Sequence, residues 1–401
     1  MLKITDKTFL YVGILLASAV LFICSCSYAQ NEPNNRNYEI DTAPFQNSAH
    51  HWYDIYDKNN VINAVPNQPR YNPAQITEIA DNILLYQRDN GGWPKNYDML
   101  AILTEEEKDI LIKAKSDLHT TFDNTTTYSH IECLAKVYEV TKVEKYKDAC
   151  LRGIDFTLSA QYSNGGWPQF FPLQKNYSRH ITFNDDAIVG IMKMLKDIID
   201  NKAYYSFVDS DRRQKAKAAF DKGLDCILKC QIKDDGVLTA WCQQHDENDL
   251  APAKARAYEL PSICNREGTG IVLFLMSIDN PSPEIINSVQ SAVKWFEDSK
   301  IIGIRVEDFN TPPVKFPLRT LTTDKRVVQD PNAPPIWARF YELKTHRPLF
   351  SNRKSEVFYS MAEVDRERRA YGWYTYEPQR ALDEYPAWQK KWAPDQNVLK
   401  K

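Results

Sequence analysis

Acidic side chains recur where three predicted helices begin. The segments TFDN at 121–124, TFNDD at 182–186 and NREG at 265–268 each precede apolar residues with helical spacing. Asp and Asn are common N-terminal caps, so helix capping alone would explain any one of these segments. If the three helices occupy equivalent places in a repeating fold, however, their carboxylates lie on one rim. Carboxylate oxygens gathered in this way suit a hard cation such as calcium.

Arginines with aromatic or apolar neighbours form a second group of candidates. Arg256 lies in AKARAYELP, Arg339 in WARFY and Arg353 in FSNR. A partly buried guanidinium binds carboxylates through two parallel hydrogen bonds, which predicts an acidic substrate; structural salt bridges are the alternative. Arg179 and His180 stand just before the second acidic segment, where they could bind substrate. The histidines lack zinc-site spacing, and no Ser-His-Asp arrangement is identifiable.

A long internal repeat spaces these candidates along the chain. The strings QRDNGGWP at 87–94 and QYSNGGWP at 161–168 are nearly identical, and weaker copies surround Gly236 and Gly303. Apolar residues between the copies step by three or four positions, as helices require. Each unit is therefore predicted to be a helical hairpin, which must stack on its neighbours or close with them into a ring. The predicted fold class is therefore all-α. Trp93 or Lys95, which belong to the first copy of the repeat, could reach a substrate cleft.

The chain after Val306 departs from this pattern. It is rich in proline and aromatic residues, including the string DPNAPPIW at 330–337. We expect loops with short strands in this part of the chain. Long structureless loops are uncommon unless they are functional, so the C-terminal segment is predicted to line a cleft.

The first 29 residues are typical of an export signal. Lys3 and Lys7 precede an apolar stretch at 9–24, and small residues follow it. Cleavage after Ala29 would release the mature chain, whereas a lipoprotein signal would place a lipid anchor on Cys26, and both alternatives stay open. The protein is therefore expected outside the cytoplasm of a bacterium: secreted, periplasmic or on the outer surface. The apolar stretch is too short and too near the terminus for a membrane span, and no later stretch competes with it.

Composition divides the mature chain and limits its partners. Residues 30–70 are rich in Asn, Pro and Gln and lack periodicity, which predicts an irregular linker or lead-in before a folded domain over 71–401. A formal charge of −3 with mixed signs offers no basic stripe, so no nucleic-acid partner is expected. Six cysteines follow the leader, and both disulfides and buried free thiols remain open for them.

Seven strings that occur in one order connect the chain to a known family. Between Asn72 and Asp383 they are NGGWPKNYDM, TFDNTTTYSHI, NGGWPQFFP, YSRHITFNDDA, ARAYELPS, DPNAPPIWARFYEL and RPLFSNR. With them the chain resembles the pectate lyases of polysaccharide lyase family 10. The resemblance implies an (α/α)3 toroid of helical hairpins with a loop-rich C-terminal segment. It also implies calcium-assisted β-elimination on polygalacturonate (pectate), which leaves a 4,5-unsaturated oligogalacturonide.

The resemblance assigns the metal and the base to particular residues. Asp185 is expected as the first calcium ligand and Asp123 as the second, with Asp186 as a further candidate. Arg256 takes the place of the base that removes the C5 proton. Elimination requires neutralisation of the carboxylate beside C5, which calcium and cationic side chains would provide most strongly in the transition state. Because a guanidinium is normally protonated, this role predicts activity at alkaline pH, and Lys254 is the alternative base.

The same resemblance places five side chains at the substrate: Arg339, Arg353, Arg179, His180 and Asp123. The string FSNRKSE departs from the family pattern, because Lys354 stands where an acidic residue is expected. This departure bears on the details of the sugar-binding subsites.

Three other classes of protein share parts of this pattern. A noncatalytic glycan-binding surface protein is the main alternative, favoured by export and by an aromatic content of 12%. A triterpene cyclase shares the string QxxxGxW, but it would need a DxDD motif that this sequence lacks. An α/α-barrel glycoside hydrolase would need a paired acid and base that cannot be nominated here.

Overall fold

The structure, a computed structural model, describes residues 38–54, 60–317 and 320–399. These residues belong to one compact unit, Arg36–Lys401. The predicted export signal over residues 1–29, including Cys26, lies outside the described residues. None of the helices that the structure does describe is long and apolar enough to cross a membrane.

Helices dominate the described part of the chain. They are α1 (Gln46–Asp54), α2 (Ile76–Tyr86), α3 (Glu105–Lys113), α4 (Tyr128–Thr141), α5 (Glu144–Ser159), α6 (Ala187–Ile199), α7 (Ser210–Cys230), α8 (Asn265–Met276), α9 (Pro283–Ser299), α10 (Arg366–Arg369) and α11 (Pro378–Trp392). Short 3-10 helices, labelled η, separate several of them. A capping box starts α3, where Thr104 Oγ1 accepts a hydrogen bond from the Glu107 N–H at 3.2 Å.

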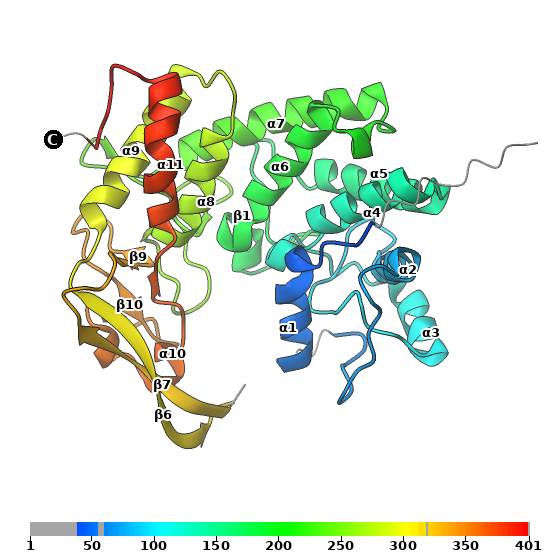
Figure 1. Cartoon of the computed structure of the whole chain (residues 1–401), viewed down its shortest axis with the longest axis horizontal. Helices are drawn as coiled ribbons and strands as arrows, with labels where there is room; N and C mark the ends of the chain where they lie inside the picture. Colours follow the sequence, from blue (N-terminus) through cyan, green and yellow to red (C-terminus); the bar gives the residue numbers. More distant parts are fainter. Residues whose placement is uncertain (1–37, 55–59, 318–319, 400–401) are drawn as a thin grey trace, which may run out of the picture. The chain divides into compact units, whose positions relative to one another are not determined.

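Three helical hairpins stack along the chain: α4 with α5, α6 with α7, and α8 with α9. The first helices contact one another in sequence, and so do the second helices, a row that begins with α2 against α5. Helix α11 packs against both α8 and α9 (Figure 1). Their apolar faces share one core that extends from Ile40 to Trp388. The predicted hairpins are therefore confirmed, while their closure into an (α/α)3 toroid stays a prediction.

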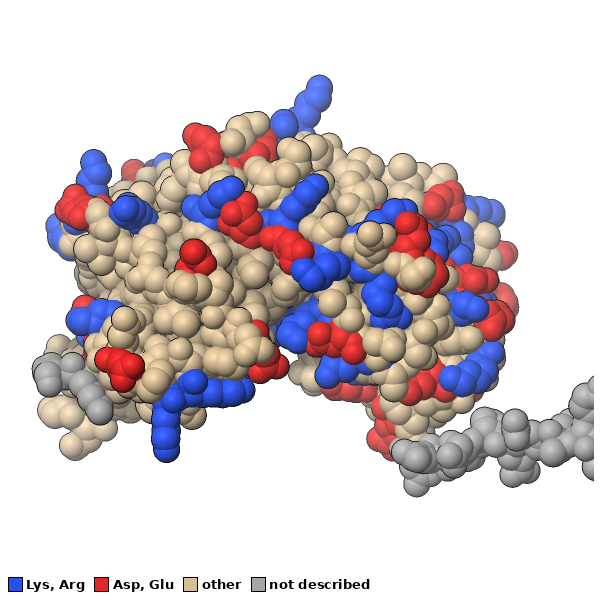
Figure 2. Space-filling view, turned by 90° about the horizontal axis from the view of Figure 1, so that it is seen from above, with Lys and Arg blue, Asp and Glu red and all other residues tan. Residues whose placement is uncertain are grey.

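Charges of both signs alternate on the outer helices. On α7, Lys215 pairs with Asp211 at 2.7 Å and Lys217 pairs with Asp221 at 2.5 Å. Figure 2 shows lysines and arginines interspersed with acidic residues over one face of the molecule. Exposed pairs of this kind stabilise a helix by only about 0.3–0.5 kcal/mol each. The stack is therefore held mainly by its apolar core.

A glycine turn follows α2, α5, α7 and α9. Gly91, Gly165, Gly236 and Gly303 have φ angles of 92°, 95°, 84° and 82°, a left-handed region that other side chains rarely adopt. All four predicted turns are thus confirmed. At Gly165 the chain also approaches α7 so closely that a Cβ would collide with the carbonyl group of Lys222. At Gly236 nothing that the structure describes lies within 4 Å of such a Cβ.

Gly165→Ala is expected to lower the free energy of unfolding by about 3 kcal/mol or more, because it adds a collision to the cost of a left-handed alanine. Gly236→Ala is the matched control, with only the backbone cost of about 1–2 kcal/mol. Urea unfolding followed by circular dichroism measures both variants. Equal losses would show that the close approach to Lys222 contributes nothing.

A buried tryptophan braces each unit. The indole N–H of Trp93 donates to the main-chain carbonyl of Ile83 at 2.8 Å. Three further tryptophans repeat this contact: Trp167 with Thr157 at 2.9 Å, Trp241 with Ile227 at 2.7 Å and Trp337 with Phe296 at 2.7 Å. All four side chains are completely buried. Each of the four indoles therefore ties its turn to the helix before it.

A long β-ribbon splits the fourth unit. Strands β6 (Ile304–Lys315) and β7 (Thr320–Gln329) pair antiparallel between Gly303 and Trp337. The prediction of loops with short strands is wrong for this stretch. Most ribbon residues are partly or fully exposed, so no alternation of buried and exposed positions marks the strands in the sequence.

The ribbon leaves the surrounding turn intact. The N–H of Ile301 donates to the carbonyl of Ile336 at 2.7 Å, and the reverse bond measures 2.9 Å. Arg88 and Gly92 close the first turn in a similar way, at 2.9 Å. Trp337 thus occupies the place that Trp93 holds in the first unit.

The other strands are two-residue pairs that fasten loops together. They are β1 (Ile181–Thr182) with β4 (Gln244–His245), β2 (Lys233–Asp234) with β3 (Val237–Leu238), β5 (Ile263–Cys264) with β9 (Phe340–Tyr341), β8 (Trp337–Ala338) with β12 (Tyr374–Thr375), and β10 (Phe350–Ser351) with β11 (Val357–Phe358). A small second core, which includes Tyr258, Phe350 and Trp373, lies among the C-terminal loops. Short strands are thus confirmed after the ribbon, but α11 was not predicted.

Helix α1 corrects the prediction of an irregular lead-in over residues 30–70. Its Trp52 is buried and donates its indole N–H to the carbonyl of Ile62 at 3.0 Å. Ser48 is also buried and donates its hydroxyl to the carbonyl of Tyr97 at 3.1 Å. Tertiary contacts of this kind stabilise a short polar helix that its own composition does not predict.

The six cysteines after the leader are all free thiols. They are Cys133, Cys150, Cys226, Cys230, Cys242 and Cys264, and all are buried. Burial raises the pKa of Cys133 to about 12, which keeps it protonated and unreactive. Of the two open alternatives, the structure therefore shows buried thiols rather than disulfides.

Candidate active site

Two acidic turns follow the same backbone path. The turns η3 (Asp123–Thr125) and η5 (Asn184–Asp186) lie side by side, just before α4 and α6. Asn124 and Asp185 both adopt the left-handed conformation, with φ angles of 52° and 49°. Asn and Asp accept this conformation better than other non-glycine residues. The two turns are equivalent in backbone path but not in the position of the carboxylate. Asp123 directly follows Phe122, whereas Asp185 follows Phe183 by two residues.

Both acidic turns and the start of α8 are tied to the loop after the next tryptophan. Three main-chain bonds from N–H to carbonyl repeat this link: Phe122 to Gln169 at 3.0 Å, Phe183 to Gln243 at 2.9 Å and Asn265 to Arg339 at 2.9 Å. Lys95, Gln169, Gln243 and Arg339 are thus equivalent, since each stands two residues after a bracing tryptophan. The fold therefore lines up four polar side chains beside the acidic turns.

A pocket of about 80 Å³ lies between the two acidic turns and the segment after β4. It is lined by His51, Lys95, Asp123, Asn124, Gln169, Tyr177, Asn184, Asp185, Gln244, Ala255, Arg256 and Glu259. Three of the predicted site residues, Asp123, Asp185 and Arg256, meet in this pocket. The structure thus brings together both principal candidates for calcium binding and the candidate base.

Asp123 is buried and forms an ion pair with Lys95. Burial would raise the pKa of its carboxyl group, but the positive charges of Lys95 and Arg256 outweigh burial and lower that pKa. Its other oxygen, Oδ1, is buried without a hydrogen-bond partner among the described residues. Asp123 is therefore an ionised carboxylate with one oxygen available to a ligand.

Asp185 lies in the same pocket and accepts a hydrogen bond from the Asn184 amide at 2.9 Å. Burial and the negative charge of Asp123 raise its pKa to about 7. Two carboxylates that oppose each other's ionisation create a demand for positive charge. A calcium ion bound to oxygens of both residues would meet that demand, so the side chains present fit this metal.

Arg256 lines the pocket as a cation held by Glu259. Its Nε donates to Glu259 Oε2 at 2.8 Å, and its Nη2 donates to Oε1 of the same residue. The guanidinium carbon lies 5.3 Å and 5.8 Å from the ring centroids of Tyr258 and Tyr371. Burial would lower the pKa of Arg256, but Glu259 outweighs burial and raises it above its ordinary value. Arg256 is thus charged and fixed in orientation.

Arg339 and Lys254 do not line this pocket. Arg339 is buried, pairs with Glu267 and donates to Asn184 Oδ1 at 3.2 Å. Burial would raise the pKa of Glu267, but Arg339 and a neighbouring arginine lower it to about 2. Arg339 therefore supports the pocket wall through Asn184, and its contact with substrate stays a prediction. Lys254 is exposed and donates to Ser355 Oγ at 2.7 Å.

Arg179 and His180 both bind Glu247, outside the pocket lining. His180 Nδ1 lies 2.9 Å from Glu247 Oε2. Together with Asp246, His180 and Glu247 are close enough to share a cation, although Arg179 already supplies positive charge to Glu247. The predicted substrate contacts of Arg179 and His180 stay predictions.

Asp186 and Arg353 also lie outside the pocket lining. Asp186 is an exposed residue, but its Oδ1 lies against Gly270 of α8, where partial burial raises the pKa of the carboxyl group. Arg353 donates to both oxygens of Glu367, from Nε at 3.0 Å and from Nη2 at 2.8 Å. Asp186 is therefore not among the residues that line the pocket with Asp123 and Asp185, and its part in calcium binding stays a prediction.

Eight pocket residues were not candidates at the level of sequence: His51, Asn124, Gln169, Tyr177, Asn184, Gln244, Ala255 and Glu259. For Gln169 the repeat itself carries the signal, because Lys95 and Gln169 directly follow the two copies of Trp-Pro. His51 belongs to α1, the helix that composition conceals. Glu259 follows Arg256 by three residues, but the sequence does not reveal their ion pair.

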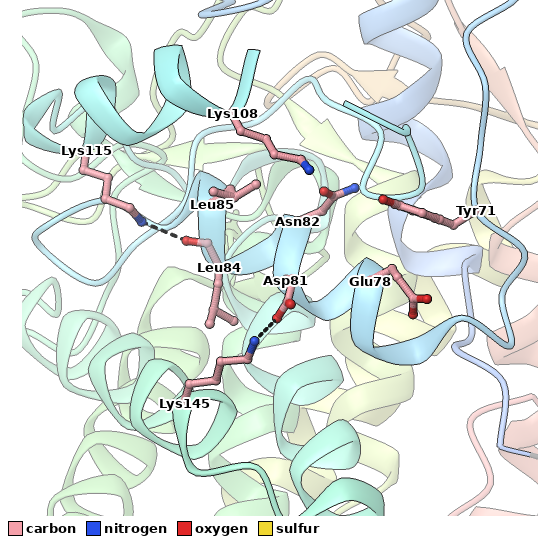
Figure 3. A pocket seen from close by; sticks show the side chains of 9 residues that line it. All are labelled: Tyr71, Glu78, Asp81, Asn82, Leu84, Leu85, Lys108, Lys115 and Lys145. Carbon is pink, nitrogen blue, oxygen red and sulfur yellow. Dashed lines mark hydrogen bonds and ion pairs between the residues drawn. The ribbon is translucent and has the colours of Figure 1, made fainter. Parts of the chain in front are cut away.

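A wider pocket lies elsewhere, between α2, α3 and α5 (Figure 3). It measures about 530 Å³ and contains none of the predicted site residues. Its lysines already have partners: Lys145 pairs with Asp81 at 2.6 Å, and Lys115 donates to the carbonyls of Leu84 and Gln87 at 2.9 Å and 3.0 Å. These contacts explain the lysines as structural, since Lys115 satisfies carbonyls at the end of α2.

Comparisons with known proteins bear on the same region. Residues 87–382 match the model of the family Pectic acid lyase. This range contains Asp123, Asp185 and Arg256 together with all four bracing tryptophans. Comparison with curated protein sequences found no match.

Two solved structures of a family 10 polysaccharide lyase from Cellvibrio cellulosa are similar to this protein. A mutant in complex with trigalacturonic acid is 32% identical, with a TM-score of 0.67 over 77% of this chain and 92% of that chain. A second structure of the lyase is also 32% identical, with a TM-score of 0.65 over 77% of this chain and 91% of that chain. The chain therefore belongs to the pectic acid lyase family and is similar to the family 10 polysaccharide lyases.

Proposed function

We propose that the protein is a pectate lyase that cleaves polygalacturonate, a (1→4)-α-D-galacturonan, by calcium-assisted β-elimination. The observation that carries this proposal is the pocket in which Asp123, Asp185 and Arg256 converge. Membership of the family supports the reaction class, and the complex of the Cellvibrio relative with trigalacturonic acid supports the substrate class.

Asp123 and Asp185 would hold the calcium ion. The free, buried Oδ1 of Asp123 and the raised pKa of Asp185 both favour a cation at this place. When bound, calcium would supply the charge that neutralises the uronate carboxylate next to C5. Asn184 positions Asp185 by its hydrogen bond, and Arg339 positions Asn184 from behind.

We assign the removal of the C5 proton to Arg256. In the elimination the C5–H bond breaks and Arg256 takes the proton, while the electron pair of that bond forms the C4–C5 double bond. The C4–O bond breaks with its electron pair on the oxygen of the leaving sugar, which takes up a proton from water. Glu259 orients the guanidinium, but it also raises the pKa of Arg256. Only the deprotonated fraction can accept the proton, so the rate is expected to rise with pH in the alkaline range.

This function requires the protein to meet a large polyanion. Such a polymer cannot cross a lipid bilayer unaided, because its charges would have to leave water. The export proposed for residues 1–29 would place the enzyme with its substrate, either as a secreted protein or as one anchored by a lipid at Cys26.

A single assay tests this proposed function. Purified protein is incubated with polygalacturonate and calcium at alkaline pH, and the ultraviolet absorbance of the unsaturated product is followed. We expect a steady rise that a calcium chelator stops and that added calcium restores. Absence of a chelator-sensitive rise would contradict the proposal. New reducing ends without this absorbance would indicate a hydrolase, and binding without cleavage would indicate the glycan-binding alternative.

A further inference from the structure

Lys95 lies among the charged side chains that line the pocket. Its ammonium group binds Asp123 Oδ2, and its side chain is only 23% exposed. The ammonium nitrogen also lies 5.5 Å from the centroid of the Phe170 ring, at a distance suited to a cation–π contact. Lys95 is therefore enclosed between a carboxylate and an aromatic ring.

The repeat shows that the fold itself does not need a charge at this position. Gln169 and Gln243 take the equivalent places in the second and third units, and both are neutral. In the fourth unit Arg339 is charged, but Glu267 is its direct partner. The charge of Lys95 thus belongs to the pocket and not to the scaffold that the four units share.

The pocket holds two carboxylates, Asp123 and Asp185, that have no arginine as a direct partner among the described residues. Arg256 is bound to Glu259, so Lys95 is the cation in direct contact with Asp123, and Asp185 lines the same pocket. A divalent ion bound to this pair would lie beside the ammonium group. Like charges at such short range repel strongly in a buried pocket, where water screens them little.

We propose that Lys95 is an internal counter-ion that occupies Asp123 in the metal-free protein and must release it when calcium binds. The competition lowers the calcium affinity of the free enzyme. Lysine suits this role because its flexible side chain lets the ammonium group move. The nearby Phe170 ring can stabilise that charge by a cation–π contact after Asp123 is released. This inference rests on the calcium site proposed above and makes Lys95 a positioning residue.

The test measures calcium binding without substrate. Wild-type protein and Lys95→Gln are titrated with calcium chloride alone in a calorimeter; the substitution introduces the residue found at position 169. We expect Lys95→Gln to bind calcium about tenfold more tightly or better. Lys95→Arg, which keeps the charge, should show no such gain. Lys136→Gln, which removes a lysine paired with Glu132 on the surface of α4, should leave the affinity unchanged.

Thermal unfolding provides a second readout. At one calcium concentration, the rise in Tm should be larger for Lys95→Gln than for wild type, because tighter binding stabilises the folded state more. Lys95→Met serves as the neutral variant should the glutamine variant fail to fold. Equal or weaker affinity in the neutral variant, an equal gain in Lys95→Arg, or no calcium binding by either protein would overturn the inference. The proposed function would fail differently, through absence of unsaturated product from the wild-type enzyme.

Discussion

Arg256→Ala is expected to lower kcat on polygalacturonate by at least about 10³-fold, which corresponds to about 4 kcal/mol of transition-state stabilisation. Among the residues that the structure describes, its side chain is the only guanidinium in the pocket lining, and Glu259 fixes it there. Lys254→Ala is the matched control, because Lys254 lies two residues away and binds Ser355 instead. It should keep most of the activity. The opposite pattern in initial rates of product absorbance would reassign the base to Lys254.

Arg256→Lys separates a base from a fixed cation. The ordinary pKa of lysine is about 10.4, at least two units below that of arginine. If Arg256 removes the C5 proton, the lysine variant therefore has its base available at lower pH, and the rising limb of its pH–rate profile shifts in that direction. Partial activity with an unshifted profile would instead identify Arg256 as a cation that only neutralises the substrate.

Asp185→Asn is the second change with a large expected effect. It preserves the size of the side chain but removes one of the two carboxylates that would hold calcium. We expect kcat/KM to fall by about 10²–10³-fold, since a charge that stabilises the transition state is lost with the metal. Asp123→Asn should act similarly, and it also leaves Lys95 without its carboxylate.

Asp186→Asn is the control for this pair, because Asp186 does not line the pocket and its Oδ1 lies against Gly270. It should retain nearly all activity at every calcium concentration. Rates measured over a calcium series distinguish the three variants: Asp185→Asn should need more calcium than Asp186→Asn to reach the same rate. If Asp186→Asn lost as much as Asp185→Asn, the ligand set would have to include the exposed residue.

Sequence patterns predicted the scaffold because its local requirements are strict. A left-handed turn at Gly165 and a buried indole at Trp167 each allow few residue types, so the two copies remain nearly identical. The fourth turn was predicted at Gly303, but its tryptophan was not, because the ribbon separates Gly303 from Trp337. Helix α1 escaped for a different reason, since its burial depends on contacts made by Trp52 and not on its own composition.

The site was predictable to the extent that its residues recur. Asp123 and Asp185 could be paired because they follow the same Thr-Phe string at two helix starts. What sequence could not supply was the choice of partner for each charge. Arg339 was expected to bind an acidic substrate, but in the structure Glu267 is its direct partner. A guanidinium binds either carboxylate by the same geometry, so only the fold distinguishes them.

The β6–β7 ribbon begins and ends at neighbouring points of the fold. The N–H of Asp330 donates to the carbonyl of Gly303 at 2.8 Å, so the two ends are held together independently of the length between them. The entropy of closing such an excursion grows only slowly with its length. The fourth turn is therefore a point at which the chain tolerates insertions. Evolution or design can replace the ribbon by a segment of another length or sequence there, while Trp337 and Arg339 keep their positions.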